Sequence, residues 1–251
     1  MAELSGGRRR VALVTGASRG IGRAIAGRLA GDGFHAVLTY RADANGAAAA
    51  VREILSAGGS AEAARCDAAV KDDILALAER LERERGGVDV LVNNAAVLKN
   101  GLFALMPDAN WEIVLRTALD GTFHTTKAVV RGMLQRRWGR IVNVSSLAAF
   151  SGSAGQTNYA AAKGALVAFT KSLAAEVGPY GITVNAVAPG FVETEMISFL
   201  SREAREDFIR RIPMQRFGTP ADIAPFVSFL CSDGAAYLTG QTIRVDGGFV
   251  G

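Results

Sequence analysis

The chain has 251 residues, of which 49% are hydrophobic and 21% are charged, and its formal net charge is +4. This length and composition predict a single domain, residues 1–251, with a large buried core. No apolar run reaches the roughly 18 residues of a membrane span, and no signal-peptide core follows the first charges. We therefore predict a cytoplasmic protein that does not bind membranes, with residues 1–9 flexible.

Basic residues gather in two clusters, at residues 8–10 and at Arg131, Arg136, Arg137 and Arg140. Aromatic residues that stack on bases do not alternate with them, so we interpret each cluster as a solvated face and predict no nucleic-acid partner. The two cysteines, Cys66 and Cys231, lie far apart and lack the spacing of metal ligands. We expect both to be buried, with no disulfide framework and no metal site.

The first apolar run, residues 11–15 (VALVT), predicts a buried parallel strand. A glycine-rich turn follows at residues 16–22, and a helical pattern continues to about Ala30. Glycines in such a turn allow free N–H groups at the start of the helix to face a phosphate. The alternative is a turn with a structural role only. We predict that these residues of the turn contact a nucleotide cofactor: Gly16, Ser18, Arg19, Gly20 and Ile21.

The second predicted strand, residues 35–40, ends where a dinucleotide-binding fold contacts the adenosine ribose. An Asp or Glu at that point is typical of NAD binding, but this chain has Tyr40 and Arg41. Arg41, with Arg19, has the charge and geometry to pair with a 2′-phosphate, which favours NADP(H). Asp43 lies nearby and argues for NAD, and two ordinary surface arginines are the alternative interpretation.

Residues 44–57 are Ala-rich and predict a helix, and residues 61–66 predict a third strand. Asp67 follows that strand and either accepts from an adenine amino group or caps the next helix, residues 70–84. A fourth strand, residues 88–92, precedes Asn93-Asn94-Ala95-Ala96, where small residues leave room for a cofactor and Asn amides tie loops together. The predicted contacts here are Cys66, Asp67, Asn93 and Ala95. Strands that alternate with helices indicate a parallel sheet.

Residues 111–135 predict one or two helices, and residues 140–145 predict a fifth strand that leads to Ser146. The helix predicted over residues 158–175 places Tyr159 and Lys163 on one face, four residues apart. An ammonium close to a phenol lowers the phenol pKa, so Tyr159 becomes a candidate proton donor or acceptor. The Ser146 hydroxyl is placed to bind a substrate carbonyl oxygen. Taken alone, these residues are more typical of an ordinary solvated face and a turn, and it is the rest of the chain that favours the catalytic interpretation.

The sixth strand, residues 181–188, leads into a loop where the nicotinamide end of a cofactor would lie. Its predicted contacts are Pro189, Gly190, Val192 and Thr194. Residues 191–214 then mix charges with the apolar side chains of Met196, Phe199, Leu200 and Phe208, which predicts a substrate lid or, alternatively, a surface flap. Thr219 and Pro220 predict a helix start, and residues 241–245 a last strand.

Five motifs together resemble short-chain dehydrogenases/reductases along nearly the whole chain: TGASRGIG at residues 15–22, Asp67, NNAA at 93–96, Ser146 with YAAAK at 159–163, and PGFVET at 189–194. The overall impression is most similar to 3-oxoacyl-[acyl-carrier-protein] reductases and their relatives in polyketide and acetoacetyl-CoA metabolism. The resemblance implies an α/β, doubly wound, Rossmann-like sheet of seven parallel strands. It also implies a homo-oligomer, a tetramer or a dimer.

By this resemblance Tyr159 is the general acid, Lys163 holds the nicotinamide ribose and lowers the phenol pKa, and Ser146 fixes the carbonyl oxygen. Thr194 and the backbone of Val192 orient the carboxamide. The implied activity is the NADPH-dependent reduction of a 3-oxoacyl thioester, on a carrier protein or CoA, in fatty acid or polyketide biosynthesis. Arg131 and its neighbours then attract an acidic acyl carrier protein. Reduction of another ketone, a sugar or a quinone is the alternative.

The chain departs from the family pattern at two positions. Ala118 stands seven residues after Trp111, where the family usually has an Asn that helps hold a water linked to the Lys. Because a methyl group cannot hold that water, Thr117, a backbone carbonyl or another water replaces it, or proton resupply is slower. A third hypothesis is therefore a weakly active partner subunit of a mixed oligomer. Ala96, in place of the usual Gly, is a smaller change.

Overall fold

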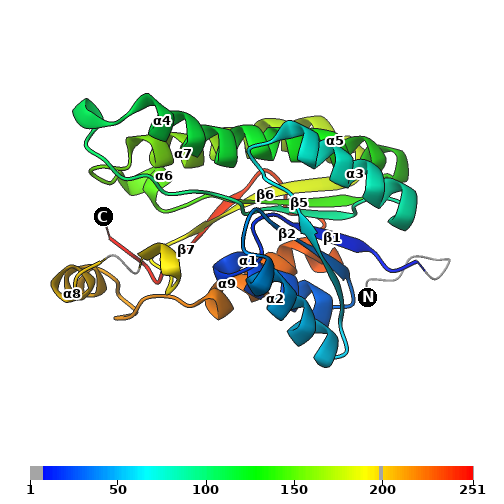
Figure 1. Ribbon diagram of the computed structural model, residues 1–251, viewed down its shortest axis with the longest axis horizontal. Coiled ribbons are helices and arrows are strands. Elements are labelled where there is room, and N and C mark those ends of the chain that lie inside the picture. Colours follow the sequence, from blue (N-terminus) through cyan, green and yellow to red (C-terminus); the bar gives the residue numbers. More distant parts are fainter. Residues whose placement is uncertain (1–7, 198–199, 251) are drawn as a thin grey trace.

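Seven parallel strands form one sheet in the computed structural model, which describes residues 8–197 and 200–250 (Figure 1). The strand order is β3-β2-β1-β4-β5-β6-β7, which confirms the predicted doubly wound fold. The strands are β1 (Val11–Val14), β2 (His35–Tyr40), β3 (Ser60–Arg65), β4 (Val90–Asn93), β5 (Gly139–Val144), β6 (Ile182–Pro189) and β7 (Thr242–Val245).

Helices cover both faces of this sheet (Figure 1). One face carries α1 (Gly20–Gly31), α2 (Ala44–Ser56) and α9 (Pro220–Cys231). The other carries α3 (Lys71–Arg85), α4 (Asp108–Leu115), α5 (Gly121–Arg136) and α7 (Thr157–Val177). The short helices α6 (Ala148–Ser151) and α8 (Arg202–Arg210) lie near the last strands. Within residues 8–197 and 200–250, no helix combines the length and apolarity needed to cross a membrane.

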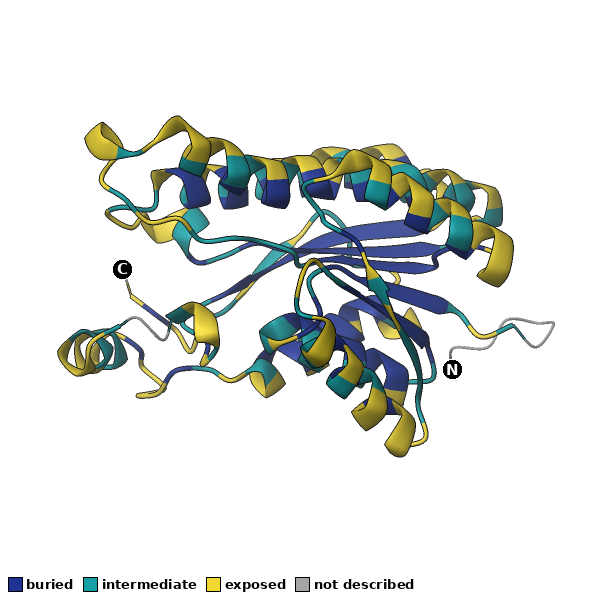
Figure 2. Ribbon diagram, viewed as in Figure 1, coloured by how far each residue is buried: buried dark blue, intermediate teal, exposed yellow. Residues whose placement is uncertain are grey.

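Alternate residues of the central strands send their side chains into two separate cores. Ala12 and Val14 of β1 pack with α1 and α9, whereas Val11 and Leu13 pack with α3, α5 and α7. The strands at the centre of the sheet are accordingly buried along their length (Figure 2). Cys66 and Cys231 are free and buried, as the sequence predicted. Because the sheet is parallel, the carboxyl ends of its strands meet at one edge, where the predicted site residues lie.

The basic clusters are only in part the solvated faces that the sequence predicted, because Arg9, Arg131 and Arg137 are exposed but the other members are not. Arg140 is 3% exposed, and the Arg136 guanidinium lies 3.3 Å from the Asp89 carboxylate, which is itself buried. Arg8 also pairs with Asp89, at 2.8 Å, so this residue of the expected flexible segment 1–9 is anchored. Residues 1–7 lie outside the described part of the chain. The prediction was wrong for the less exposed arginines because a sequence shows where charges cluster but not which buried carboxylate they face.

Candidate active site

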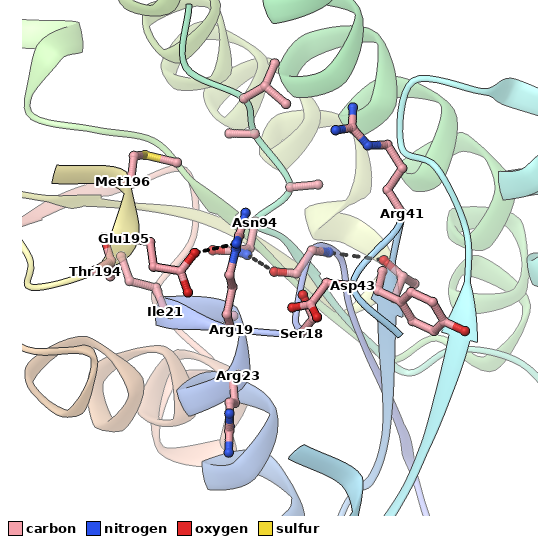
Figure 3. A pocket seen from close by; sticks show the side chains of 18 of the residues that line it. Ser18, Arg19, Ile21, Arg23, Arg41, Asp43, Asn94, Thr194, Glu195 and Met196 are labelled. Carbon is pink, nitrogen blue, oxygen red and sulfur yellow. Dashed lines mark hydrogen bonds and ion pairs between the residues drawn. The ribbon is translucent and has the colours of Figure 1, made fainter. Parts of the chain in front are cut away.

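A pocket of about 1250 Å³ opens at the carboxyl ends of β1, β2 and β4 (Figure 3). Most of the predicted cofactor contacts line it: Gly16, Ser18, Arg19, Gly20, Ile21, Tyr40, Arg41, Cys66, Asp67, Ala95 and Thr194. The other predicted residues are not part of its lining: Asn93, Ser146, Tyr159, Lys163, Pro189, Gly190 and Val192. Asn93 is buried, and its amide donates to Asn143 Oδ1 at 2.9 Å, inside the core.

The glycine turn leaves no room for side chains at two of its positions. Gly16 has φ +63°, and a Cβ there would lie 2.9 Å from the Cα of Ala95. A Cβ on Gly22 would meet Asn94 Nδ2 at 2.5 Å, so the turn packs closely against the loop after β4. Helix α1 begins at Gly20, and no side chain caps its first N–H groups. These groups are therefore available to an anion such as a pyrophosphate.

Asn94 fixes this turn against the loop that follows β4. Its Nδ2 donates to the carbonyl oxygens of Thr15 and Gly16, each at 2.9 Å, and the Thr15 hydroxyl accepts from the Asn94 and Ala95 N–H groups at 3.0 Å. The prediction that the Asn amides tie neighbouring loops together is confirmed. Both walls of the pocket are therefore held by directional bonds rather than by packing alone.

Charged groups surround the end of β2. Arg41 is exposed and lines the pocket, and Arg19 forms an ion pair with Glu195 across it (Figure 3). Asp43, the residue that argued for NAD, caps α2 by accepting from the Gly46 N–H at 3.0 Å. A carboxylate in this N-cap role already has a backbone partner. Arg41 and Asp43 therefore both lie beside the end of β2, and the carboxylate also serves to start α2.

Asp67 does not cap the helix that follows it, which was one of its two predicted roles. Helix α3 has Val70 at its N-cap, without a side-chain hydrogen bond, and Asp67 Oδ1 instead accepts from the Ala69 N–H at 2.9 Å. The Asp67 N–H donates to Asp73 Oδ2 at 2.9 Å. These bonds hold Asp67 in a tight turn at the pocket wall, which leaves the contact with an adenine amino group as its remaining predicted role.

Tyr159 and Lys163 share one face of α7 next to Ser146, as the sequence predicted, and that face is buried. Lys163 is 2% exposed, its Nζ donates to Val144 O at 2.6 Å, and it lies 5.7 Å from the centroid of the Tyr159 ring. A hydrogen bond joins the Ser146 and Tyr159 side chains. Tyr159 also packs against Val97, in the loop that lines the nucleotide pocket. The three side chains thus converge behind one wall of that pocket.

Burial governs the protonation of both ionisable groups. It lowers the pKa of Lys163 from 10.5 to about 8, because the charged ammonium loses water. It also raises the pKa of the Tyr159 phenol, while the hydrogen bond from Ser146 opposes that rise. The prediction that Lys163 lowers the phenol pKa is therefore wrong for this structure. The physical reason is that the Lys163 ammonium donates to a backbone carbonyl instead of acting on the phenol. The charged phenolate form of Tyr159 would lose its hydration in this buried site, so burial favours the neutral phenol.

Two further residues shape this region. Asn158, which the sequence analysis missed, is fully buried, and its amide donates to Lys99 O at 3.0 Å and Asn110 O at 3.2 Å. A single Asn at a helix start has no distinctive signal. Ala118 lies in the π-helical turn η2 (Arg116–Asp120) and packs against Tyr159 and Val114 in an apolar cluster. Its side chain offers no polar group to a water.

Comparisons with known proteins agree with this geometry. The family model described as Enoyl-(Acyl carrier protein) reductase matches residues 16–250. The 3-oxoacyl-[acyl-carrier-protein] reductase FabG of Aquifex aeolicus is 43% identical, over 95% of this chain and 96% of that protein. The FabG of Vibrio harveyi is 45% identical, with the same coverage. The chain belongs to the short-chain dehydrogenase/reductase family. It is therefore an oxidoreductase of the class that acts on CH–OH groups.

Two solved structures resemble this short-chain dehydrogenase/reductase. One is described as a gluconate dehydrogenase from Agrobacterium tumefaciens, with a TM-score of 0.92, 35% identity and 95% coverage of both chains. The other is described as an NAD(P) dependent gluconate 5-dehydrogenase from Beutenbergia cavernae with bound NADP at low occupancy. It has a TM-score of 0.92, 39% identity and 96% coverage of both chains.

Short-chain dehydrogenases/reductases use NAD(P), and the residues of this chain fit such a group. The turn packs so closely at Gly16 and Gly22 that a Cβ would clash with Ala95 or Asn94, and the first N–H groups of α1 carry no side-chain cap. Arg41 supplies positive charge where an adenosine ribose would end. A pocket of about 1250 Å³ exceeds the usual range for drug-sized ligands, as an extended dinucleotide requires.

The segment predicted as a lid carries an aromatic cluster. Phe191 lies 4.2 Å from Phe208 and 5.4 Å from Phe217, measured between ring centroids, so α8 is packed against the chain that leaves β6. Met196 is 40% exposed and lines the nucleotide pocket. Phe199 lies outside the described residues. The segment therefore borders the pocket, whereas closure over a substrate stays a prediction.

Proposed function

We propose that this short-chain dehydrogenase/reductase uses NADPH to reduce the 3-oxo group of an acyl thioester, carried by acyl carrier protein or CoA, to the 3-hydroxyacyl form. The observation that carries the proposal is the convergence of Ser146, Tyr159 and Lys163 behind a nucleotide pocket with Arg41 at the end of β2. Identity of 43–45% to 3-oxoacyl-[acyl-carrier-protein] reductases over nearly the whole chain supports the substrate class.

The side chains divide the reaction between them. NADPH, when bound, supplies a hydride to the carbonyl carbon. Ser146 donates a hydrogen bond to the carbonyl oxygen, and Tyr159 transfers its phenolic proton to that oxygen as negative charge develops there. Lys163 holds the nicotinamide ribose. The phenol carries its proton at neutral pH, as a general acid must in the direction of reduction, but its raised pKa makes it a weaker acid than a phenol in water.

Several features fix the proposed cofactor contacts. The turn from Gly16 to Ile21 faces the pyrophosphate, and Arg41 with Arg19 faces the 2′-phosphate. Asp67 accepts from the adenine. The chain after β6 orients the carboxamide through Val192 and Thr194. Arg19 must exchange its ion pair with Glu195 for the phosphate, so Arg41 is the phosphate contact that needs no rearrangement.

The surface supports an assembly and an acidic partner. Phe123 is 44% exposed and Phe229 is 45% exposed, an apolar character that fits contacts between subunits of a homotetramer or a dimer. Arg131 and Arg137 remain exposed on α5 and at its end, whereas Arg136 and Arg140 are engaged in the structure. The proposed docking surface for an acyl carrier protein is therefore limited to the first two. We place the enzyme in cytoplasmic fatty acid or polyketide biosynthesis.

A second candidate function is the interconversion of a sugar acid and its ketone. Two solved structures at 35% and 39% identity, both described as gluconate dehydrogenases, favour it. Steady-state oxidation of NADPH with acetoacetyl-CoA and with 5-ketogluconate separates the two functions. We expect turnover of the thioester that Tyr159→Phe abolishes. Preference for the sugar acid would replace the first proposal, and no turnover of any ketone would remove both.

The side chain of Ala118 is a buried methyl group that cannot hold a water. The third hypothesis, a weakly active partner subunit, is therefore tested as well. The purified protein is expected to turn over unaided at about 1 per second or faster. If proton resupply limits the rate, Ala118→Asn increases it, and Thr122→Ser, one helical turn later, serves as the control. Activity that appears only after addition of a homologous subunit would establish the mixed oligomer.

A further inference from the structure

A buried amide joins the start of α7 to the segment that follows β4. Asn158 lies in the first turn of α7 and is 0% exposed. Its Nδ2 donates to Lys99 O at 3.0 Å and to Asn110 O at 3.2 Å. Its Oδ1 accepts from the Tyr159 N–H at 2.7 Å, one of the N–H groups at a helix start that have no partner within the helix. The nitrogen and the oxygen of this amide are therefore both engaged.

The two carbonyl groups that Asn158 binds lie at opposite ends of one segment. Residues 99–110 run from the loop after β4, through the short turn η1 (Phe103–Leu105), to the first turn of α4. None of the three residues of η1 is buried, and Phe103 and Leu105 are 71% and 79% exposed. The segment therefore has little packing of its own between its ends. Helices α4 and α7 lie side by side (Figure 1), so one side chain reaches both ends.

The same segment begins in the wall of the nucleotide pocket. Val97, Leu98 and Lys99 line that pocket, and Val97 and Leu98 also belong to the apolar cluster around Tyr159. The chain that Asn158 holds at Lys99 therefore forms both the pocket wall and part of the surroundings of the phenol. Because the Asn158 side chain is fully buried, its donors find no water if these bonds break, and the position of the wall is strongly fixed.

A second connection between the same two segments lies at the surface. Gln156 Nε2 donates to Asn100 Oδ1 at 3.2 Å, and this bond is exposed. Water replaces either partner of an exposed bond at little cost, so the bond contributes little. The two connections differ in burial but not in the segments that they join, which makes Gln156 a matched control for Asn158.

We propose that Asn158 is a positioning residue for the reductase reaction: by holding residues 97–99 it sets the place of the nicotinamide end of the cofactor relative to Tyr159. This inference rests on the proposed function, which places the nicotinamide beside the phenol. A displacement of reacting groups by about 1 Å lowers a rate about 100-fold, so release of this segment is expected to reduce turnover. The phosphate end of the cofactor site, at Arg41 and the glycine turn, lies on other elements and is expected to be unaffected.

Binding of two nucleotides tests the proposal without catalysis. NADPH carries the nicotinamide, whereas 2′,5′-ADP represents only the adenosine half with its 2′-phosphate. In calorimetric titrations, Asn158→Ala is expected to bind NADPH about tenfold more weakly and 2′,5′-ADP within about twofold of wild type. Asn158→Asp keeps an oxygen for the Tyr159 N–H but loses the amide donors, so the same result is expected. Gln156→Ala is expected to match wild type with both nucleotides.

Steady-state kinetics provide a second readout. In both Asn158 variants kcat is expected to fall about 100-fold while the KM for the ketone changes little. The deuterium isotope effect with NADPH labelled at C4 is expected to rise, because misplacement slows the chemical step itself. A loss of stability alone would not change this isotope effect.

Wild-type affinity for NADPH in either variant would overturn the proposal, and in Asn158→Asp alone it would show that only the bond to the Tyr159 N–H matters. Equal weakening of both nucleotides, or loss of 2′,5′-ADP binding in both variants, would also overturn it, because Asn158 would then support the whole fold. If one variant does not fold, the other decides. A wild type without turnover of any ketone would refute the proposed function, whereas the comparison of the two nucleotides would still decide this proposal.

Discussion

Replacement of Lys163 by Met is expected to stabilise the fold at neutral pH while abolishing activity. Lys163 is 2% exposed, and burial lowers its pKa from 10.5 to about 8. At pH 7 the folded protein therefore holds a charged ammonium in a site that disfavours charge. Methionine has a similar volume and no charge, so it removes this unfavourable term from the folded state.

The magnitude follows from linkage between folding and protonation. The difference between 10.5 and about 8 corresponds to about 3 kcal/mol of destabilisation at pH 7. Loss of the bond to Val144 O offsets about 1 kcal/mol of the gain, which leaves a net stabilisation of about 2 kcal/mol. Between about pH 8 and 10.5 the unfolded wild type binds a proton that the folded form has released, so wild-type stability rises with pH there. The advantage of the variant therefore disappears near pH 10.

Urea unfolding of both proteins at pH 7 and pH 10 measures this change. Other groups titrate equally in the two proteins, so the difference between them isolates Lys163. Lys171→Met, on the exposed face of the same helix, is the matched control and should show no such dependence on pH. The reasoning fails if Lys163→Met is less stable than wild type at pH 7, or if its free energy of unfolding relative to wild type is the same at both pH values.

Three other changes have defined outcomes. Arg41→Gln should raise the KM for NADPH about tenfold and leave that for NADH unchanged in steady-state assays; equal effects on both would exclude a phosphate contact. Asp89→Asn should lower the free energy of urea unfolding by about 3 kcal/mol, against no change in the exposed control Glu82→Gln, because two arginines lose a buried partner. Asp222→Ala should lower it by about 1 kcal/mol through loss of the capping box, since its carboxylate accepts from the Thr219 N–H at 2.7 Å. Hydrogen bonds from Arg216 hold the Asp222 pKa well below its usual range, so this difference should be complete at pH 7, begin to decrease below about pH 4 and disappear only as the pH falls through the lowered pKa of the folded state.

The architecture was predictable because most of the central strands are apolar and glycine or polar residues bound them. Residues 35–40 were predicted as a strand and form β2 with the same limits. The start of α9 was predicted from Thr219 and Pro220, and a capping box is present there. The prediction of one or two helices over residues 111–135 left the π-helical turn η2 unseen. An extra residue in a helix changes its hydrogen bonds but not its pattern of apolar residues.

The composition of the site was predictable, but its electrostatics were not. Spacing placed Tyr159 one turn before Lys163, yet it could not show that both are buried, nor that the ammonium bonds to Val144 O. The direction of the Tyr159 pKa followed from that burial. The burial of Arg140 was missed for the same reason. Local patterns indicate which residue types meet, whereas the dielectric environment depends on every element packed around them.

Directional bonds, more than apolar packing, fix the position of the helix that carries the catalytic side chains. At its start, Asn158 donates to Lys99 O at 3.0 Å, and one turn later Ser145 Oγ donates to Lys163 O at 2.8 Å. Further along, Asn143 of β5 donates to Thr170 Oγ1 at 2.8 Å. Apolar contacts allow a helix to slide or rotate by small amounts at little cost, but hydrogen bonds at three heights do not. A buried lysine that destabilises the fold is therefore held in place by neighbours whose geometry would be lost if α7 moved.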